Sequence, residues 1–191
     1  MSVPDGTLCG MSDDRPVHFA QRWTGDDRAR PPALGDERTL LTSFLDYYRR
    51  TFELKCVGVA PERLPERGVP PSRLSLHGLA RHLAGVERWW FRIQFAGVDL
   101  SMLHYSDDDP DQDFEGLDGD PGEALDVWRA ECDAARAVVA AAGSLQQTGT
   151  RRSDGTAFSL RWLLVNVTAE YAQHCGHADL LRERIDGRTG H

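Results

Sequence analysis

The chain has few cysteines, no long apolar run and no excess of positive charge, and each shortage excludes a class of protein. Its four Cys are widely spaced without a CxxC pair, which argues against a zinc ribbon or a disulfide framework and favours a reducing cytoplasm. No stretch approaches the roughly 20 apolar residues of a membrane span, and residues 1–10 contain no apolar signal-peptide core. With 22 basic and 30 acidic residues, the net charge of −8 argues against nucleic acid.

Motifs for phosphate binding and for nucleophilic hydrolysis are also missing. We find no Gly-rich phosphate loop and no credible Ser-His-Asp order. What the 191-residue chain does have is 40% apolar residues, enough to bury a core and to form a soluble globular protein. The expected partner is a small molecule, with no membrane or nucleic acid involved, and a homodimer is left open.

Apolar residues recur at intervals of three and four over four segments, which predicts four amphipathic helices. They cover about residues 39–55, 75–96, 121–142 and 158–185, separated by a Pro-rich linker at 58–71, an acidic stretch at 107–120 and a polar connection at 144–157. Almost no alternating strand pattern occurs, so we predict an all-α fold, a four-helix bundle. Residues 1–36 are expected to form a polar arm, partly disordered or strapped on the body, and 37–191 the bundle. The acidic stretch does not match a calcium loop and is expected to be a solvated loop.

Glu170 and His174 interrupt the apolar face of the last helix. A four-residue spacing directs both side chains into the same part of the interior. Burial of a lone carboxylate is costly, so Glu170 must face solvent, hold a proton or meet a cation, and without a cation we expect its pKa to rise. On the second helix His82 lies on or beside the apolar face, whereas His77 shares a face with Arg81 and is expected to be exposed.

Two imidazoles and one carboxylate from facing helices suit Zn²⁺, Ni²⁺ or Fe²⁺, with coordination positions left for water. The same residues also fit a hydrogen-bonded core histidine and a Glu–His pair on a helix surface. His177 is a ligand or a hydrogen-bond donor to His174, and Cys175 is a packing residue with a thiolate ligand as its alternative. Spacing alone leaves these interpretations open.

Two runs resemble the DinB/YfiT-like superfamily, closest to its uncharacterised mini-circle protein branch. They are LSLHGLARHLAGVERWWF at 74–91 and EYAQHCGHADLLR at 170–182. The resemblance covers about residues 37–188 and implies a metal-binding bundle with up-down-down-up topology. It also implies one ligand His in the second helix and an [HE]xxxH pair in a late helix, which correspond to His82, Glu170 and His174. Glu in place of the commoner His resembles the mycothiol-dependent maleylpyruvate isomerase arrangement.

The resemblance further implies a metal that activates a low-molecular-weight thiol such as mycothiol or bacillithiol for transfer or isomerisation. We therefore expect a cytoplasmic, divalent-metal-dependent enzyme that activates such a thiol or a water molecule. The alternative is a non-catalytic protein of stress response that binds a metal or a small ligand. Many relatives have no known reaction, so superfamily membership constrains the chemistry weakly.

Overall fold

The computed structural model describes residues 26–188 except Asp107 and Pro110, so much of the expected arm, residues 1–25, lies outside the described part. The elements in chain order are α1 (Glu37–Cys56), a 3-10 turn (Pro61–Arg63), α2 (Leu76–Glu87), a π-helical segment (Arg88–Phe95), α3 (Gln112–Glu115), α4 (Pro121–Ala141), β1 (Thr148–Thr150), β2 (Ala157–Ser159) and α5 (Leu160–Asp186). The predicted all-α bundle is confirmed, and in this described part the strands amount to one short hairpin. None of the helices in these ranges has the length and apolar character needed to cross a membrane.

Short polar side chains begin the four long helices, because they accept hydrogen bonds from main-chain N–H groups that have no partner inside the helix. These caps are Asp36 for α1, Ser75 for α2, Asp120 for α4 and Ser159 for α5. Gly187 ends α5 with a φ of 75°, a conformation that glycine adopts without a Cβ clash. Helix ends are thus encoded locally.

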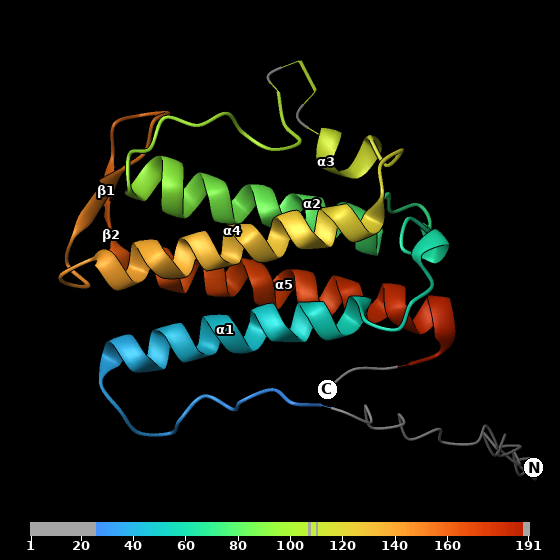
Figure 1. Cartoon of the computed structure of the whole chain (residues 1–191), viewed down its shortest axis with the longest axis horizontal. Coiled ribbons are helices and arrows are strands. Elements are labelled where there is room, and N and C mark those ends of the chain that lie inside the picture. The colour runs from blue at the N-terminus through green and yellow to red at the C-terminus, as the bar shows by residue number, and fades with distance from the viewer. Residues whose placement is uncertain (1–25, 107, 110, 189–191) are drawn as a thin grey trace, which may run out of the picture.

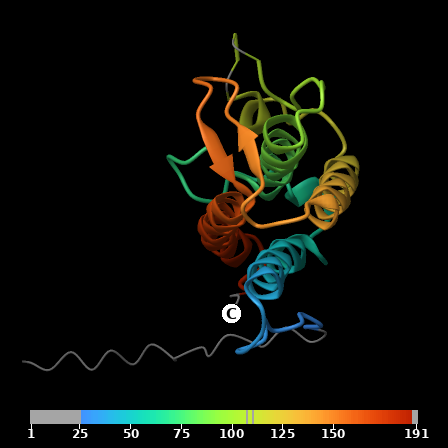
Figure 2. The ribbon, with the colours of Figure 1, turned by 90° about the vertical axis from the view of Figure 1, so that its left-hand side faces the viewer.

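The four long helices pack in an up-down-down-up arrangement (Figure 1). α1 and α5 run in one direction and lie side by side, while α2 and α4 both run in the opposite direction. The connection between α2 and α4 returns along the bundle and carries α3, which packs on α2. Seen along the helix axes, the hairpin lies across one end of the bundle (Figure 2). This connection is the reason why α3 can reach the middle of α2.

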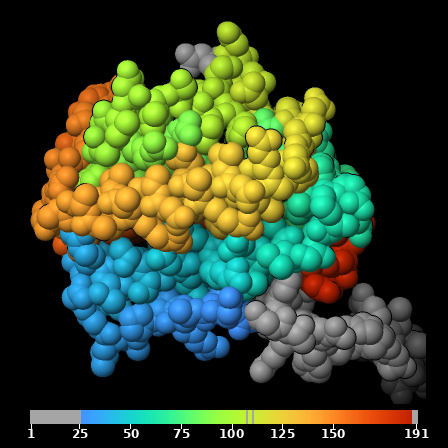
Figure 3. All heavy atoms as spheres, viewed as in Figure 1, coloured from blue at the N-terminus to red at the C-terminus, as the bar shows by residue number. Residues whose placement is uncertain are grey.

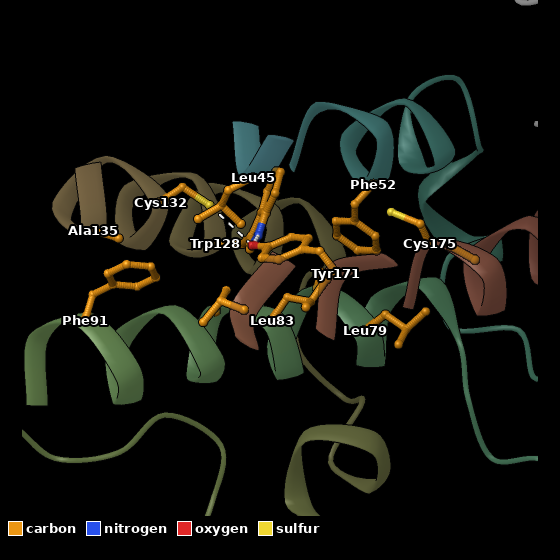
Figure 4. Packing of buried hydrophobic residues seen from close by; sticks show 14 of the residues in the cluster. Leu45, Phe52, Leu79, Leu83, Phe91, Trp128, Cys132, Ala135, Tyr171 and Cys175 are labelled. Atoms are coloured by element: carbon orange, nitrogen blue, oxygen red, sulfur yellow. Dashed lines mark hydrogen bonds between the residues drawn. The ribbon is translucent and has the colours of Figure 1, made fainter. Parts of the chain in front are cut away.

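Aromatic side chains from all the long helical segments fill the core between them (Figure 4). Phe52 of α1 and Trp128 of α4 meet edge to face with ring centroids 5.3 Å apart. Phe91, Leu83 and Tyr171 are fully buried around them. The apolar stripes that predicted the helices are therefore the surfaces that pack together.

The loops differ from the sequence expectations in two places. The polar connection after α4 forms the β1–β2 hairpin, in which Gly149 pairs with Phe158. Position 149 has no room for a side chain, since a Cβ there would lie 2.6 Å from the Cα of Phe95. The acidic stretch is not a solvated loop throughout, because it contains α3, which packs on α2. Short strands and a four-residue helix leave little periodicity to detect.

Candidate metal centre

The structure brings His82, Glu170 and His174 together, with one nitrogen or oxygen atom from each residue all within 4.8 Å of one another. Nε2 of His82 and Nε2 of His174 both lie 3.1 Å from the same oxygen, Oε1 of Glu170. α5 supplies the last two residues one turn apart, and α2 supplies the first from the neighbouring helix. Glu170 and His174 thus lie side by side, as their four-residue spacing on one helix predicted.

Solvent reaches the group from the Glu170 side. The His174 side chain is 10% exposed, that of His82 is 22% exposed and that of Glu170 is 33% exposed. The rings of His82 and His174 lie with centroids 4.7 Å apart. The arrangement is therefore a half-buried cluster whose carboxylate is partly exposed to solvent.

The electrostatics of the cluster correct one expectation. Hydrogen bonds from His174 and His82 hold the pKa of Glu170 well below its usual range, so the predicted rise without a cation is wrong. Burial alone would lower the pKa of His82, but its hydrogen bonds to Asp113 and Glu170 outweigh burial and raise it to about 9. The carboxylates of Asp113 and Glu170 stabilise positive charge on His82. The same negative charge would favour a divalent cation at this place.

Two further side chains contact the ring nitrogens that point away from Glu170. Nδ1 of His82 lies 2.7 Å from Oδ2 of Asp113, on α3. Nδ1 of His174 lies 3.3 Å from Nδ1 of His177, one turn further along α5. His177 is thus a hydrogen-bond partner of His174 and stands outside the group of three.

Several neighbouring side chains lie elsewhere than the sequence suggested. His77 is 2% exposed, so the prediction of an exposed histidine is wrong. The first turn of α2, which carries it, packs against Leu64 from the chain before the helix and against α3 from the chain after it. Arg81 is also buried and donates to the main-chain oxygen of Gln112. Cys175 is buried, as expected of a packing residue, and its pKa is raised by burial to about 12.

Sequence reasoning missed a buried polar network that includes Tyr171, the residue after Glu170. Arg49 donates two hydrogen bonds to Glu87, at 2.8 and 2.7 Å. Tyr171 donates to Glu87, and Trp128 donates to the Tyr171 hydroxyl. Tyr171, which directly follows Glu170, is fully buried and directed into the core. Glu87 interrupts an apolar stripe just as Glu170 does, and this was the signal that could have found it.

A cavity of about 360 Å³ lies between α1 and α4. The surfaces of these two helices adjoin on the face shown in Figure 3. The walls of the cavity include three guanidinium groups, each already bonded within the protein. Arg49 pairs with Glu87, Arg136 pairs with Asp46, and Arg38 donates to main-chain oxygens at the end of α4. No member of the His–Glu–His group lines this cavity, so the chemistry that the donor atoms suggest belongs to the α2–α5 side.

An all-α bundle whose interior gathers two imidazoles and a carboxylate has the donor set of helical bundles that hold a divalent metal. The sequence model of the family described as mycothiol-S-transferase matches residues 40–187. The chain belongs to this family, which is part of the DinB/YfiT-like superfamily that the two sequence runs resembled. Among curated proteins no match to the chain is found. The narrower resemblance to the mini-circle branch stays an expectation.

Proposed function

We propose that the protein is a metal-dependent enzyme that activates a mycothiol-type thiol for transfer to a small electrophile. His82, Glu170 and His174 are the proposed metal ligands. The observation that supports this most strongly is the convergence of two imidazole Nε2 atoms on one carboxylate oxygen, in a chain of the mycothiol-S-transferase family.

Two distances in the group, from Glu170 to each histidine, fit a metal of the proposed kind. Ligand atoms about 2.0–2.1 Å from a tetrahedral ion lie roughly 3.3 Å from each other. Both nitrogen–oxygen separations around Glu170 are 3.1 Å, close to that value. Two imidazoles and one carboxylate suit Zn²⁺, Ni²⁺ or Fe²⁺ and leave at least one coordination position for another molecule.

Each part of the site has a separate task in this proposal. When bound, the metal would lower the pKa of a coordinated thiol and favour its ionised, nucleophilic form. Glu170 contributes the negative charge that offsets the cation, and its exposed side admits the thiol. The nearby protein thiol, Cys175, is kept protonated by burial and donates to the main-chain oxygen of Tyr48. The reacting sulfur is therefore expected to come from a small molecule.

Elemental analysis of the purified protein tests the metal site. We expect about one divalent metal per chain, and a loss of most of it in the His174→Ala variant. The His104→Asn variant is the control, because it removes a histidine outside the group and keeps a residue that tolerates the φ of 49° at this position. Equal metal content in the two variants would contradict the proposed ligands.

A cobalt-substituted sample tests the thiol. Addition of a mycothiol analogue should produce a sulfur-to-cobalt charge-transfer band, which the His82→Ala protein should not show. A spectrum that several thiols leave unchanged, in protein proved to hold its cobalt, would contradict thiol binding. Metal-dependent ester or amide hydrolysis by that protein would then indicate activation of water. Metal binding without turnover of any substrate would favour the non-catalytic alternative.

A further inference from the structure

Asp113 is the acidic residue that the fold brings into contact with the candidate metal centre. Its Oδ2 atom lies 2.7 Å from Nδ1 of His82, although the two residues are 31 positions apart in the chain. The Asp113 side chain is only 14% exposed. A short contact between two largely buried groups fixes both of them, because each has few other orientations that keep a hydrogen bond.

We infer that Asp113 is a positioning residue that holds the His82 ring with Nδ1–H toward α3 and Nε2 toward Glu170. This inference rests on the proposed metal site and adds to it a fourth residue that touches no metal. A histidine that binds a metal through Nε2 carries its proton on Nδ1, and a carboxylate that accepts this hydrogen bond sets both the tautomer and the ring orientation. The carboxylate also makes the imidazole a more basic ligand.

The other acidic residues of α3 and its start have different partners. Asp111 and Glu115 pair with Arg73, and their side chains are 60% and 34% exposed. Asp113 pairs with His82, and its second oxygen is buried without a hydrogen-bond partner in the part of the chain that the structure describes. The acidic residues of this short helix thus have two roles, since the outer carboxylates attach α3 to the segment before α2 and Asp113 contacts the candidate site.

The packing of α3 on α2 keeps Asp113 at this place. Phe114 stacks on the His82 ring with centroids 5.1 Å apart and an interplanar angle of 27°. Arg81 donates to the main-chain oxygen of Gln112 at 2.8 Å. Gly78 leaves the space for this approach, because a Cβ there would lie 3.1 Å from the Phe114 ring. His82 is therefore fixed by a hydrogen bond at one edge and by an aromatic ring against its face.

Among the described residues, the second imidazole of the group has only a weaker contact at its Nδ1 atom. Nδ1 of His174 lies 3.3 Å from Nδ1 of His177, which is a longer contact, on the same helix, with an imidazole in place of a carboxylate. The carboxylate contact of His82 is both shorter and charge-assisted, the stronger kind of hydrogen bond. The positioning role is accordingly assigned to Asp113.

Zinc affinity and the state of the His82 ring test this inference together. Zinc affinity is measured by competition with a chromophoric chelator, and the Nδ1–H of His82 is observed by NMR of protein labelled with ¹⁵N-histidine. We expect Asp113→Ala to bind zinc about 10- to 100-fold more weakly, the usual cost of losing such a partner, and to lose the slowly exchanging Nδ1–H signal. Asp113→Asn should recover most of the zinc affinity and most of the Nδ1–H signal, because its amide oxygen still accepts the hydrogen bond.

Asp111→Ala is the matched control, because it removes a carboxylate from the same segment and breaks only the exposed pair with Arg73. It should bind zinc within about twofold of the parent protein and keep the Nδ1–H signal. An equal loss in Asp111→Ala would show that attachment of α3 alone matters and would overturn the inference. Parent-like affinity in a folded Asp113→Ala would overturn it while leaving the metal site intact. Failure of the parent protein to bind zinc at His174 would instead overturn the proposed function.

Discussion

Buried charges in this bundle depend on a partner of opposite charge, and Arg49 is that partner for Glu87. Glu87 is fully buried and accepts hydrogen bonds from Arg49 and Tyr171. Removal of one member of a buried pair leaves the other charge without compensation, at a cost of about 3–5 kcal/mol. Arg49→Met should therefore lower the free energy of unfolding by about this amount, measured by urea denaturation.

The surface pair Arg161–Glu37 provides the comparison, since its side chains are 35% and 52% exposed. Arg161→Met should cost less than about 1 kcal/mol, because water solvates both charges in either state. Replacement of both Arg49 and Glu87 by Met should recover part of the loss seen in Arg49→Met. Similar losses in the two single variants would contradict the importance of burial.

The packing of α3 against α2 requires a residue without a side chain at position 78 of α2. Gly78 faces the Phe114 ring, whereas a Cβ at Gly176 of α5 would meet nothing within 4 Å. Gly78→Leu should lower the free energy of unfolding by about 1–3 kcal/mol, the usual range for overpacking. Gly176→Leu should leave it unchanged or raise it by up to about 1 kcal/mol, because leucine favours a helix more than glycine does.

Thermal melting of the two glycine variants without metal checks this prediction at the level of the elements. The melting temperature should fall for Gly78→Leu and should stay the same or rise for Gly176→Leu, although the chemical change is the same. A stabilised Gly78→Leu protein would mean that α3 moves away from α2 without cost. That result would also weaken the structural basis for a contact between Asp113 and His82.

The whole molecule has a core that does not depend on the candidate metal centre. All the long helical segments contribute buried apolar residues to one cluster. Removal of the metal with a chelator should therefore leave the helical circular dichroism signal intact, in contrast to a zinc finger, which unfolds. A metal present at 100 times its Kd adds about 2.7 kcal/mol, so the metal-free protein should melt roughly 5–10 °C lower.

The His174→Ala protein supplies the control for this measurement. It should melt at the same temperature with and without chelator, because it lacks one of the proposed ligands. Loss of the helical signal on chelation would show that the metal is needed for the fold itself. A chelator effect of equal size in His174→Ala would place the stabilising metal elsewhere in the molecule.

The sequence by itself determined the bundle and the three residues that meet in it. Apolar residues at helical spacing are a local property, and they located all four long helices. The interval of four between Glu170 and His174 places both on one face of a helix whatever surrounds it. His82 was located by the same pattern on its own helix. The assignment of all three as metal ligands remains a prediction that the experiments above test.

Only the tertiary structure decided what covers these helices. The burial of His77, the contact of Asp113 with His82 and the pairing of Arg49 with Glu87 all depend on segments distant in the chain. Periodicity describes one helix at a time and contains no information on which loop returns to it. The low pKa of Glu170 has causes of both kinds: the larger is the hydrogen bond from His174, one turn along the same helix, and the second is the hydrogen bond from His82 on another helix. Local patterns thus set the elements, and long-range packing decided which further groups meet at the site.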